Sequence, residues 1–195
     1  MQRVYALIDK ELLQKSDITL EKISRWIEES GIKIAQYRNK NPKSKAEIEK
    51  DLKLIRSIFS GDLIINDYLE FIDLADGIHL GQEDLEKVAP TKEEAVKRVR
   101  EKVGKKIFGI STHNKDEVLE ANRFGVDYIG LGAYRDTQTK RDAKVSGKRL
   151  LEVAKLSIHP VAIIGGVKLD DEFDESIWKM VVGSDIIKKI KEIDG

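Results

Sequence analysis

Five short polar motifs along this chain each follow a hydrophobic run that is typical of a β-strand. The five are Gln36-Tyr37-Arg38-Asn39-Lys40, Asn66-Asp67, Gly81-Gln82-Glu83-Asp84, Thr137-Gln138-Thr139-Lys140 and Ile164-Gly165-Gly166. Polar residues that repeatedly follow strands are typical of a parallel barrel, which builds its active site at the carboxyl ends of its strands. The motifs combine cations for phosphate, carboxylates for a metal, hydroxyls, and glycines for close backbone approach. Together they indicate metal-assisted chemistry on phosphorylated small molecules.

The first motif places two cations at the end of an extended segment. Gln36, Arg38 and Lys40 alternate along the chain, so their side chains point the same way. A guanidinium and an ammonium that converge there would suit a diphosphate. Taken alone, a solvated strand edge with incidental charges explains the motif equally well.

Two carboxylates, Asp67 and Asp84, follow neighbouring predicted strands. Such a pair can hold one Mg²⁺, which binds a few carboxylates together with substrate phosphates. Helix or turn capping is the better explanation of either aspartate alone. With the cations of the first motif beside them, metal binding explains both better, and Asn66 is then available to hydrogen-bond a heterocycle.

The longest predicted loop, residues 132–146, contains the fourth motif. Long loops in compact domains tend to be functional, and two hydroxyls with an ammonium make a good anion site. A solvated flexible loop remains an alternative, because the segment also carries Arg135, Asp136, Arg141, Asp142 and Lys144.

Glycine-rich turns follow the last two predicted strands. Gly165-Gly166 comes after the seventh and Gly183-Ser184 after the eighth. In a barrel these loops and a helix N-terminus form the usual phosphate site. A tight turn explains each glycine alone, but the two positions together favour phosphate binding.

The three histidines are scattered. We expect structural roles for His79, within a strand, and for His159, at the start of one. His113 follows the fifth predicted strand, where acid–base chemistry and capping are equally good explanations. Because the chain has no cysteine, this scatter argues against a zinc site.

Hydrophobic periodicity predicts the elements that must position these residues. Strands are predicted at 4–8, 32–37, 62–65, 77–80, 107–110, 128–131, 160–164 and 178–182. Helices are predicted at 19–29, 44–59 (with a Ser44–Glu47 capping box), 68–74, 91–103, 115–124, 147–156, 170–175 and 183–193. Eight strand–helix units predict an α/β fold, a single (β/α)8 TIM barrel with short loops over residues 1–195. An open doubly wound sheet is the alternative, but Asp9 stands where its glycine-rich fingerprint would follow the first strand.

Composition limits the classes of partner. Lys plus Arg and Asp plus Glu both number 35, so the net charge is +0, which gives no general attraction to nucleic acid or to an anionic membrane. The residues Met1 to Tyr5 begin no signal peptide, and no apolar run approaches the ~20 residues that span a bilayer. We expect a cytoplasmic protein with small-molecule partners, no nucleic acid and no membrane; a homo-oligomer remains open.

Seven motifs, in order, resemble those of the thiamine phosphate synthases, in the superfamily that they share with the TenI proteins. They are QYRNK, IIND, GIHLGQED, GISTH, DYIGLG, TQTK and AIIGG, and the resemblance runs from Tyr5 to about Ile187. The family couples a pyrimidine diphosphate to a thiazole phosphate with release of pyrophosphate. The resemblance implies Mg²⁺ as cofactor, carried by Asp67 and Asp84.

The resemblance also implies roles for other residues. The aminopyrimidine and its diphosphate would be held by Gln36, Arg38, Lys40, Asn66, Ser111 and Lys140. The thiazole phosphate or its carboxylate would be held by Thr137, Thr139, Gly166 and the backbone at Val182-Gly183. Further expected substrate contacts are Tyr37, Asn39, His113, Gln138, Gly165 and Ser184. Catalysis by stabilisation of charge on the leaving pyrophosphate would fall to Arg38, Lys40, Ser111 and Lys140.

The chain also departs from the family's pattern. An apolar, proline-containing stretch usually follows Gly132, where Ala133-Tyr134-Arg135-Asp136 stands here, Tyr68 replaces a polar residue, and Gly183 stands where the family has serine. Two alternative functions stay open: a TenI-type thiazole tautomerase that uses His113 as acid–base, and a non-catalytic thiamine-related binding or regulatory protein.

Overall fold

The computed structural model describes residues 1–135 and 147–194, and within them eight parallel strands close into a barrel in the order β1 to β8. The strands are β1 Val4–Asp9, β2 Ile34–Arg38, β3 Asp62–Asn66, β4 Gly77–Leu80, β5 Ile107–Thr112, β6 Tyr128–Leu131, β7 Val161–Ile163 and β8 Lys179–Val182. β1 pairs with β8 to complete the ring. The predicted TIM barrel is therefore confirmed, and the open sheet is excluded.

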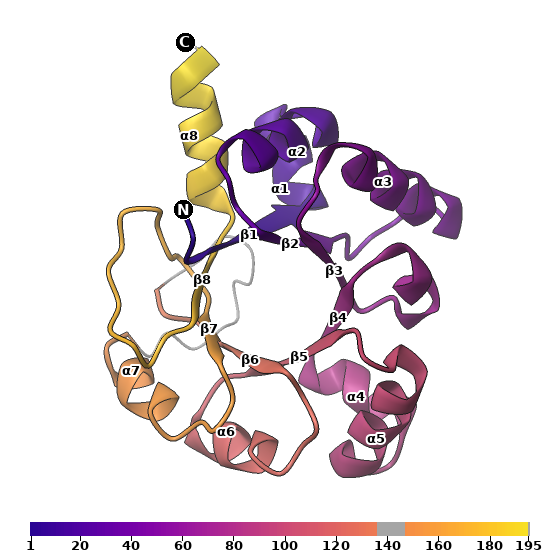
Figure 1. Cartoon of the computed structure of the whole chain (residues 1–195), viewed down its shortest axis with the longest axis vertical. Coiled ribbons are helices and arrows are strands. Elements are labelled where there is room, and N and C mark those ends of the chain that lie inside the picture. The colour runs from indigo at the N-terminus through magenta and orange to yellow at the C-terminus, as the bar shows by residue number, and fades with distance from the viewer. Residues whose placement is uncertain (136–146, 195) are drawn as a thin grey trace.

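Helices surround the barrel (Figure 1). They are α1 Lys10–Ser16, α2 Leu20–Glu29, α3 Lys45–Ile58, the 3₁₀ helix η1 Leu69–Leu74, α4 Gln82–Val88, α5 Lys92–Val103, α6 Lys115–Ala121, α7 Arg149–Ala154 and α8 Ser184–Asp194. The last helix contacts α1 and α2, so it covers the seam where β8 meets β1.

Alternation along the strands divides the apolar side chains into two cores. Seven pack together inside the barrel: Tyr5, Leu7, Ile34, Ile64, Tyr128, Ala162 and Val181. The larger outer core lies between the strands and the helices. Strands buried on both faces need nearly continuous apolar sequence, which is why hydrophobic runs alone located all eight.

Polar side chains begin several helices. The hydroxyl or amide oxygens of Thr19, Ser44, Thr91 and Asn114 accept from backbone amides three residues later. The predicted capping box at Ser44 is only half formed, because Glu47 accepts from the Lys43 amide at 2.8 Å instead of from Ser44.

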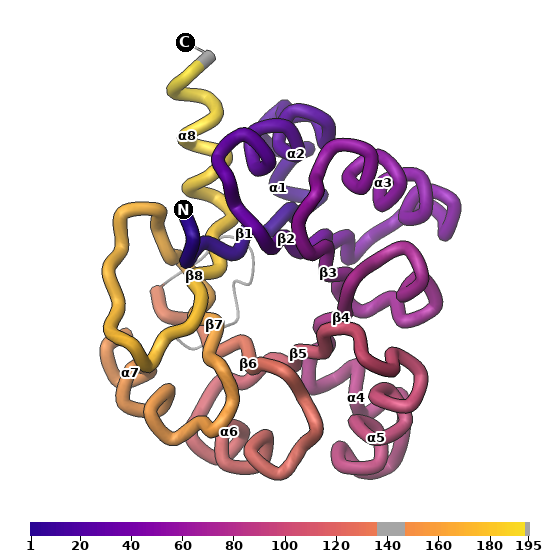
Figure 2. Tube along the Cα trace, viewed as in Figure 1, coloured from indigo at the N-terminus to yellow at the C-terminus, as the bar shows by residue number. Residues whose placement is uncertain are grey.

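The helix predicted at 170–175 is wrong. The trace from β7 to β8 runs through an open loop there (Figure 2). The Arg3 side chain donates to the carbonyls of Phe173 and Asp174 at 2.7 and 2.9 Å, so these carbonyls are satisfied without a helix. Two short helices were missed: α1, capped by Asp9 through the Leu12 amide at 3.0 Å, and α4.

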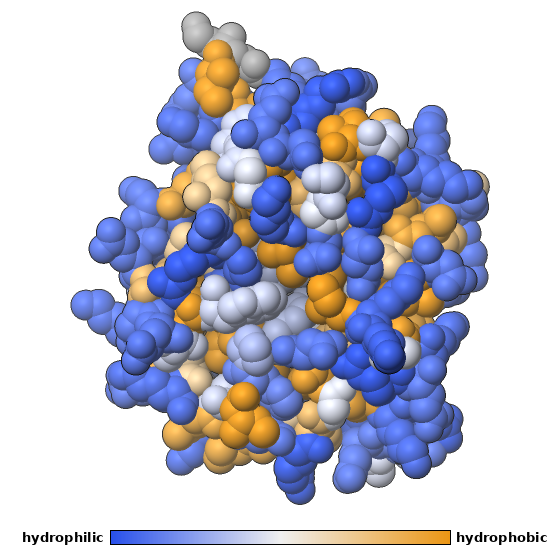
Figure 3. All heavy atoms as spheres, viewed as in Figure 1, coloured by the Kyte–Doolittle hydropathy of each residue, from blue (hydrophilic) through white to orange (hydrophobic). Residues whose placement is uncertain are grey.

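The surface carries many charged side chains, and on the face in Figure 3 hydrophobic residues appear only as scattered patches between them. Among the described residues, no helix combines the length and the apolarity needed to cross a bilayer.

Candidate functional site

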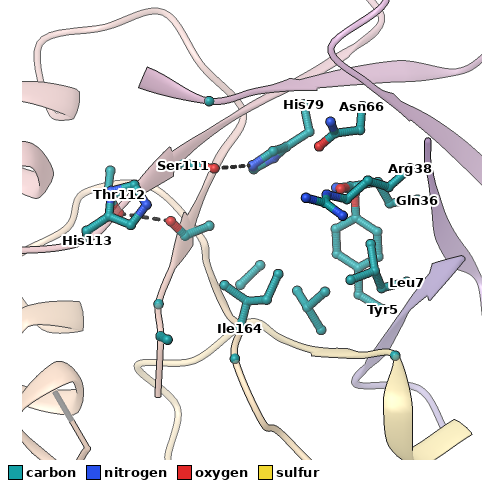
Figure 4. Close-up of a pocket in the computed structure, with 18 of the residues that line it drawn as sticks. Tyr5, Leu7, Gln36, Arg38, Asn66, His79, Ser111, Thr112, His113 and Ile164 are labelled. Atoms are coloured by element: carbon teal, nitrogen blue, oxygen red, sulfur yellow. Dashed lines mark hydrogen bonds between the residues drawn. The ribbon is translucent and has the colours of Figure 1, made fainter. Parts of the chain in front are cut away.

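One cavity of about 390 Å³ is lined by residues of all eight strands and of the loops that follow them. The volume lies in the range of small-molecule sites. The strand residues that line it are Tyr5, Leu7, Gln36, Arg38, Asn66, His79, Ser111, Thr112, Tyr128, Gly130, Ala162 and Val181. Figure 4 shows how several of these side chains converge from different strands.

A chain of hydrogen bonds crosses the inner end of this cavity. The Gln36 amide donates to the Tyr5 hydroxyl at 3.0 Å, and the Tyr5 and Tyr128 hydroxyls lie 2.9 Å apart. Tyr128 lies 2.9 Å from Nδ1 of His79, whose Nε2 lies 3.0 Å from the Ser111 hydroxyl. Five residues from five strands are therefore coupled.

The buried end of this chain sets its direction. Tyr5 is fully buried and accepts from Gln36, so we assign its own proton to the hydrogen bond with Tyr128, the other hydroxyl that it contacts. Tyr128 then donates to Nδ1 of His79, and Nε2 donates to Ser111. Burial lowers the pKa of His79 to about 4, which keeps the ring neutral. The Ser111 proton is left to be donated into the cavity.

One wall of the cavity is apolar. Leu7, Ala162, Ile164 and Val181 line it, and in Figure 4 Ile164 lies across the cavity from His79 and Asn66. A flat heterocycle would pack against this wall while its polar edge meets the hydrogen-bond chain.

Two cations stand at the outer rim, each beside an acid. Nη1 of Arg38 bonds to Oδ2 of Asp9, an aspartate that is almost fully buried. Nζ of Lys40 bonds to Oδ2 of Asp67 and lies 4.0 Å from Oδ2 of Asp84. The rim therefore offers cations that acids hold in place.

The two aspartates differ in environment. Burial raises the pKa of Asp67 to about 6, against the opposing effect of Lys40. For Asp84, burial also acts to raise the pKa, but hydrogen bonds with Lys87 and Asp67 and the charge of Lys40 lower it below its ordinary value. Oδ1 of Asp67 is buried without a hydrogen-bond partner among the described residues.

This donor set fits a hard cation that also uses other oxygen ligands. No cluster of three or more acids or histidines suited to a metal occurs within residues 1–135 and 147–194. Mg²⁺ commonly takes one or two carboxylates and completes its shell with water and substrate phosphate. The pair Asp67 and Asp84, with its orphaned oxygen, is adequate for such an ion.

Opposite the cations lies a turn built by glycines. Gly165 and Gly166 line the cavity and adopt φ angles of 96° and 62°, which glycine adopts at little cost. Gly183 and Ser184, at the start of α8, line it as well.

The structure brings most of the predicted site residues together. Those that line the cavity are Gln36, Arg38, Lys40, Asn66, Asp67, Asp84, Ser111, His113, Gly165, Gly166, Gly183 and Ser184. The predicted residues Thr137, Gln138, Thr139 and Lys140 lie outside the described part of the chain.

Two predicted substrate contacts need correction. Tyr37 points outward and donates to Asp51 of α3 at 2.6 Å. Asn39 donates to the Tyr37 hydroxyl at 3.3 Å and is likewise turned away from the cavity. In both cases strand alternation separates the residue from its cavity-lining neighbours. The side chain of Val182 packs in the outer core, so the contact predicted there involves only its backbone and stays a prediction.

Sequence reasoning missed the inner end of the cavity. Tyr5, Tyr128 and His79 line it, although we expected only a structural role for His79. The alternation of side chains along a strand could have identified this residue. His79 pairs with Asn66 in register, so both side chains face inward. Gly130 beside it leaves room, because a Cβ there would lie 3.0 Å from the imidazole.

Comparison with known proteins places this chain in a family. The profile of the family described as "Thiamine monophosphate synthase" matches residues 4–172. A thiamine-phosphate synthase of Persephonella marina is 37% identical over 171 residues, 84% of this chain and 76% of the relative. One of Clostridium tetani is 34% identical over 170 residues, with the same coverage of 84% and 76%. The fold is also that of a thiamine phosphate pyrophosphorylase from Pyrococcus furiosus, with a TM-score of 0.75, 24% identity, and 99% and 98% of the two chains covered.

Proposed function

This chain belongs to the thiamine monophosphate synthase family, and from that premise we propose the reaction that its cavity performs. Its relatives make it a transferase of thiamine biosynthesis. The substrates are 4-amino-2-methyl-5-hydroxymethylpyrimidine diphosphate and a thiazole phosphate or its carboxylate. The bond between the methylene carbon and the diphosphate oxygen breaks, a bond from the thiazole nitrogen to that carbon forms, and thiamine phosphate and pyrophosphate leave.

One observation carries this proposal: an apolar wall and a charged rim share a single cavity. Leu7, Ala162 and Ile164 offer packing for rings, while Arg38 and Lys40 stand at the rim with two carboxylates. A substrate that joins a heterocycle to a diphosphate matches both parts.

Mg²⁺ is the cofactor that the acid pair supports. Asp67 and Asp84 would hold it. Asp67 keeps a buried oxygen without a described partner, and both aspartates lie beside Lys40. Bound there, Mg²⁺ would neutralise charge on the leaving pyrophosphate.

The cations and the serine stabilise the same charge. Asp9 takes one edge of the Arg38 guanidinium, which leaves its other N–H groups for diphosphate oxygens. Ser111 donates its hydroxyl proton into the cavity, and the family pattern adds Lys140. These groups act by preorganised electrostatics, so the reaction requires no protein nucleophile.

Positioning of the two substrates supplies the rest of the rate enhancement. The barrel holds the methylene carbon and the thiazole nitrogen in line, and its apolar wall keeps water from the pyrimidinylmethyl cation. The glycine turn after β7 takes the thiazole phosphate.

A thiazole tautomerase is the second candidate, and one contact favours it. Nδ1 of His113 lies 2.8 Å from Oε2 of Glu117, and both residues line the cavity. Such a dyad can move a proton. The synthase is the better account, because a tautomerase has no need for the acid pair and the cations of the rim.

The test is a product assay with purified protein, both substrates and Mg²⁺. We expect thiamine phosphate, and no product when EDTA removes the metal. Formation of the isomerised thiazole in place of thiamine phosphate would favour the tautomerase.

A further inference from the structure

Residues 134–135, just after β6, lie directly against the glycine turn. The Tyr134 amide donates to the Ile164 carbonyl and the Arg135 amide to the Gly165 carbonyl, both at 2.9 Å. Nη1 of Arg135 donates to the next carbonyl, that of Gly166, at 3.0 Å. Three successive carbonyls of the turn therefore point toward one segment.

The orientation of these carbonyls determines that of the amides. In a planar trans peptide the C=O and the following N–H point in opposite directions. The N–H groups of Gly165, Gly166 and Val167 therefore point away from residues 134–135. All three residues line the cavity, and none of these N–H groups has a hydrogen-bond partner among the described residues.

Successive amides that point one way, with no partner in the described part of the chain, are typical of a concave anion site. The positive φ angles of the two glycines, 96° and 62°, allow the chain to curl in this way. The choice of phosphate as the anion rests on the proposed function, in which this turn receives the phosphate of a substrate.

Arg135 is itself anchored on the far side of the turn. Its Nη1 and Nη2 donate to the two carboxylate oxygens of Asp171 at 2.5 and 2.7 Å. Asp171 also accepts from the Lys168 amide at 2.8 Å, and the hydrogen bond from Arg135 holds the pKa of Asp171 below its usual value. The guanidinium stacks 4.7 Å from the Tyr134 ring centroid. It is thus fixed on two sides.

Neither member of this ion pair lines the cavity, so neither contacts a ligand bound there. We propose that Arg135 and Asp171 are positioning residues, which hold the Gly165–Val167 amides toward the cavity to bind the phosphate of the thiazole substrate. This gives a role to the charged stretch after Gly132, where the family pattern is apolar.

The test compares Arg135→Gln and Asp171→Asn with a matched control, Arg98→Gln. Arg98 also bonds a carboxylate, that of Glu94, and a backbone carbonyl, that of Val88, but it lies outside the cavity lining. The measurements are the KM for each substrate, kcat, the calorimetric Kd of inorganic phosphate, and Tm.

We expect Arg135→Gln and Asp171→Asn to raise the KM for the thiazole phosphate and the Kd of phosphate about tenfold, the size of one lost charge-assisted hydrogen bond. The KM for the pyrimidine diphosphate should stay within about twofold, because Arg38 and Lys40 are untouched. Arg135→Lys should recover part of the loss, and the double variant should be no worse than either single one. The Arg98→Gln control should match the wild type.

Unchanged phosphate Kd and thiazole phosphate KM in Arg135→Gln would overturn the proposal, as would an equal rise in both KM values with a fall in Tm, the mark of a purely structural role. The outcome is separable from the proposed function. If the wild type makes no thiamine phosphate but binds inorganic phosphate more tightly than Arg135→Gln does, the positioning role of Arg135 is supported and the synthase assignment fails. If the wild type is active and Arg135→Gln binds phosphate equally well, the synthase assignment is supported and the positioning role fails.

Discussion

Among single residues, Asp67 carries the clearest mark of function. It adopts φ 72°, and the other non-glycine residue of the described chain with positive φ, Asp17, is the C-cap of α1, where this conformation is common. A left-handed aspartate costs about 1–2 kcal/mol. Asp67 also leaves one buried oxygen without a described partner. A strained backbone and an unsatisfied side-chain oxygen at the same residue indicate a ligand-binding role.

The metal assignment predicts the effect of removing either carboxylate. Asp67→Asn and Asp84→Asn should lower kcat roughly 100-fold or more, with little change in Tm, because each would remove a carboxylate proposed to hold the Mg²⁺ that neutralises charge on the leaving pyrophosphate. Steady-state kinetics over a range of Mg²⁺ concentrations measure this effect.

The matched control is Glu86→Gln, which removes an exposed acid from the same helix as Asp84 and should leave kcat unchanged. Wild-type kcat at saturating Mg²⁺ in both aspartate variants would refute the metal assignment.

Buried His79 predicts how stability depends on pH. Its pKa is about 4 in the folded protein and about 6.5 in an unfolded chain. The unfolded state therefore binds a proton that the folded state excludes, so stability falls as pH drops from about 6.5 to 4, by roughly 3 kcal/mol. NMR titration of the imidazole should show no protonation of His79 above about pH 5, and a midpoint near 6.5 would contradict its burial as a neutral ring.

At the scale of elements, small residues on one strand make room for functional side chains of the next. A Cβ on Gly109 of β5 would lie 2.1 Å from Cζ of Tyr128 on β6. Tyr128 links Tyr5 to His79, so this contact sets the position of the hydrogen-bond chain.

Gly109→Ala should therefore displace Tyr128. We expect a loss of about 1–3 kcal/mol of stability, typical of overpacking, and a higher KM for the pyrimidine substrate. Denaturant unfolding and kinetics measure the two effects. Gly125→Ala is the control, because no atom lies within 4 Å of a Cβ there and its φ is not positive. Equal behaviour of the two variants would mean that Tyr128 has space to move.

Elements with a clear hydrophobic pattern were predictable from the sequence. Elements that depend on contacts between residues far apart in the sequence were not. The limits of β4 and β6 match the predicted 77–80 and 128–131, because apolar runs there end at glycine or polar residues. The false helix at 170–175 had a helical composition, but the side chain of Arg3, at the other end of the chain, takes its carbonyls. The short helix α1 was missed because its seven residues bury only Leu13.

The same distinction applies to the site. The rim residues Arg38, Asp67 and Asp84 carry chemistry in their types and were found from sequence. The inner hydrogen-bond chain depends on strand register, which joins Tyr5 to Tyr128 across 123 residues. The brace from Arg135 to Asp171 depends on how two loops meet, and no local pattern indicates it.

At the scale of the whole molecule, the barrel closes so that every strand contributes to one cavity. Charges balance over the chain, so the cations at the rim act locally and are not part of a general basic surface. We propose that this cavity joins two substrates and releases pyrophosphate.

The most direct test measures both products in one time course, with purified protein, the pyrimidine diphosphate, the thiazole phosphate and Mg²⁺. We expect thiamine phosphate and pyrophosphate to appear in equal amounts, and neither to appear when the thiazole phosphate is omitted. Pyrophosphate released without thiamine phosphate, or a thiazole that isomerises while the diphosphate stays intact, would contradict the proposed coupling reaction.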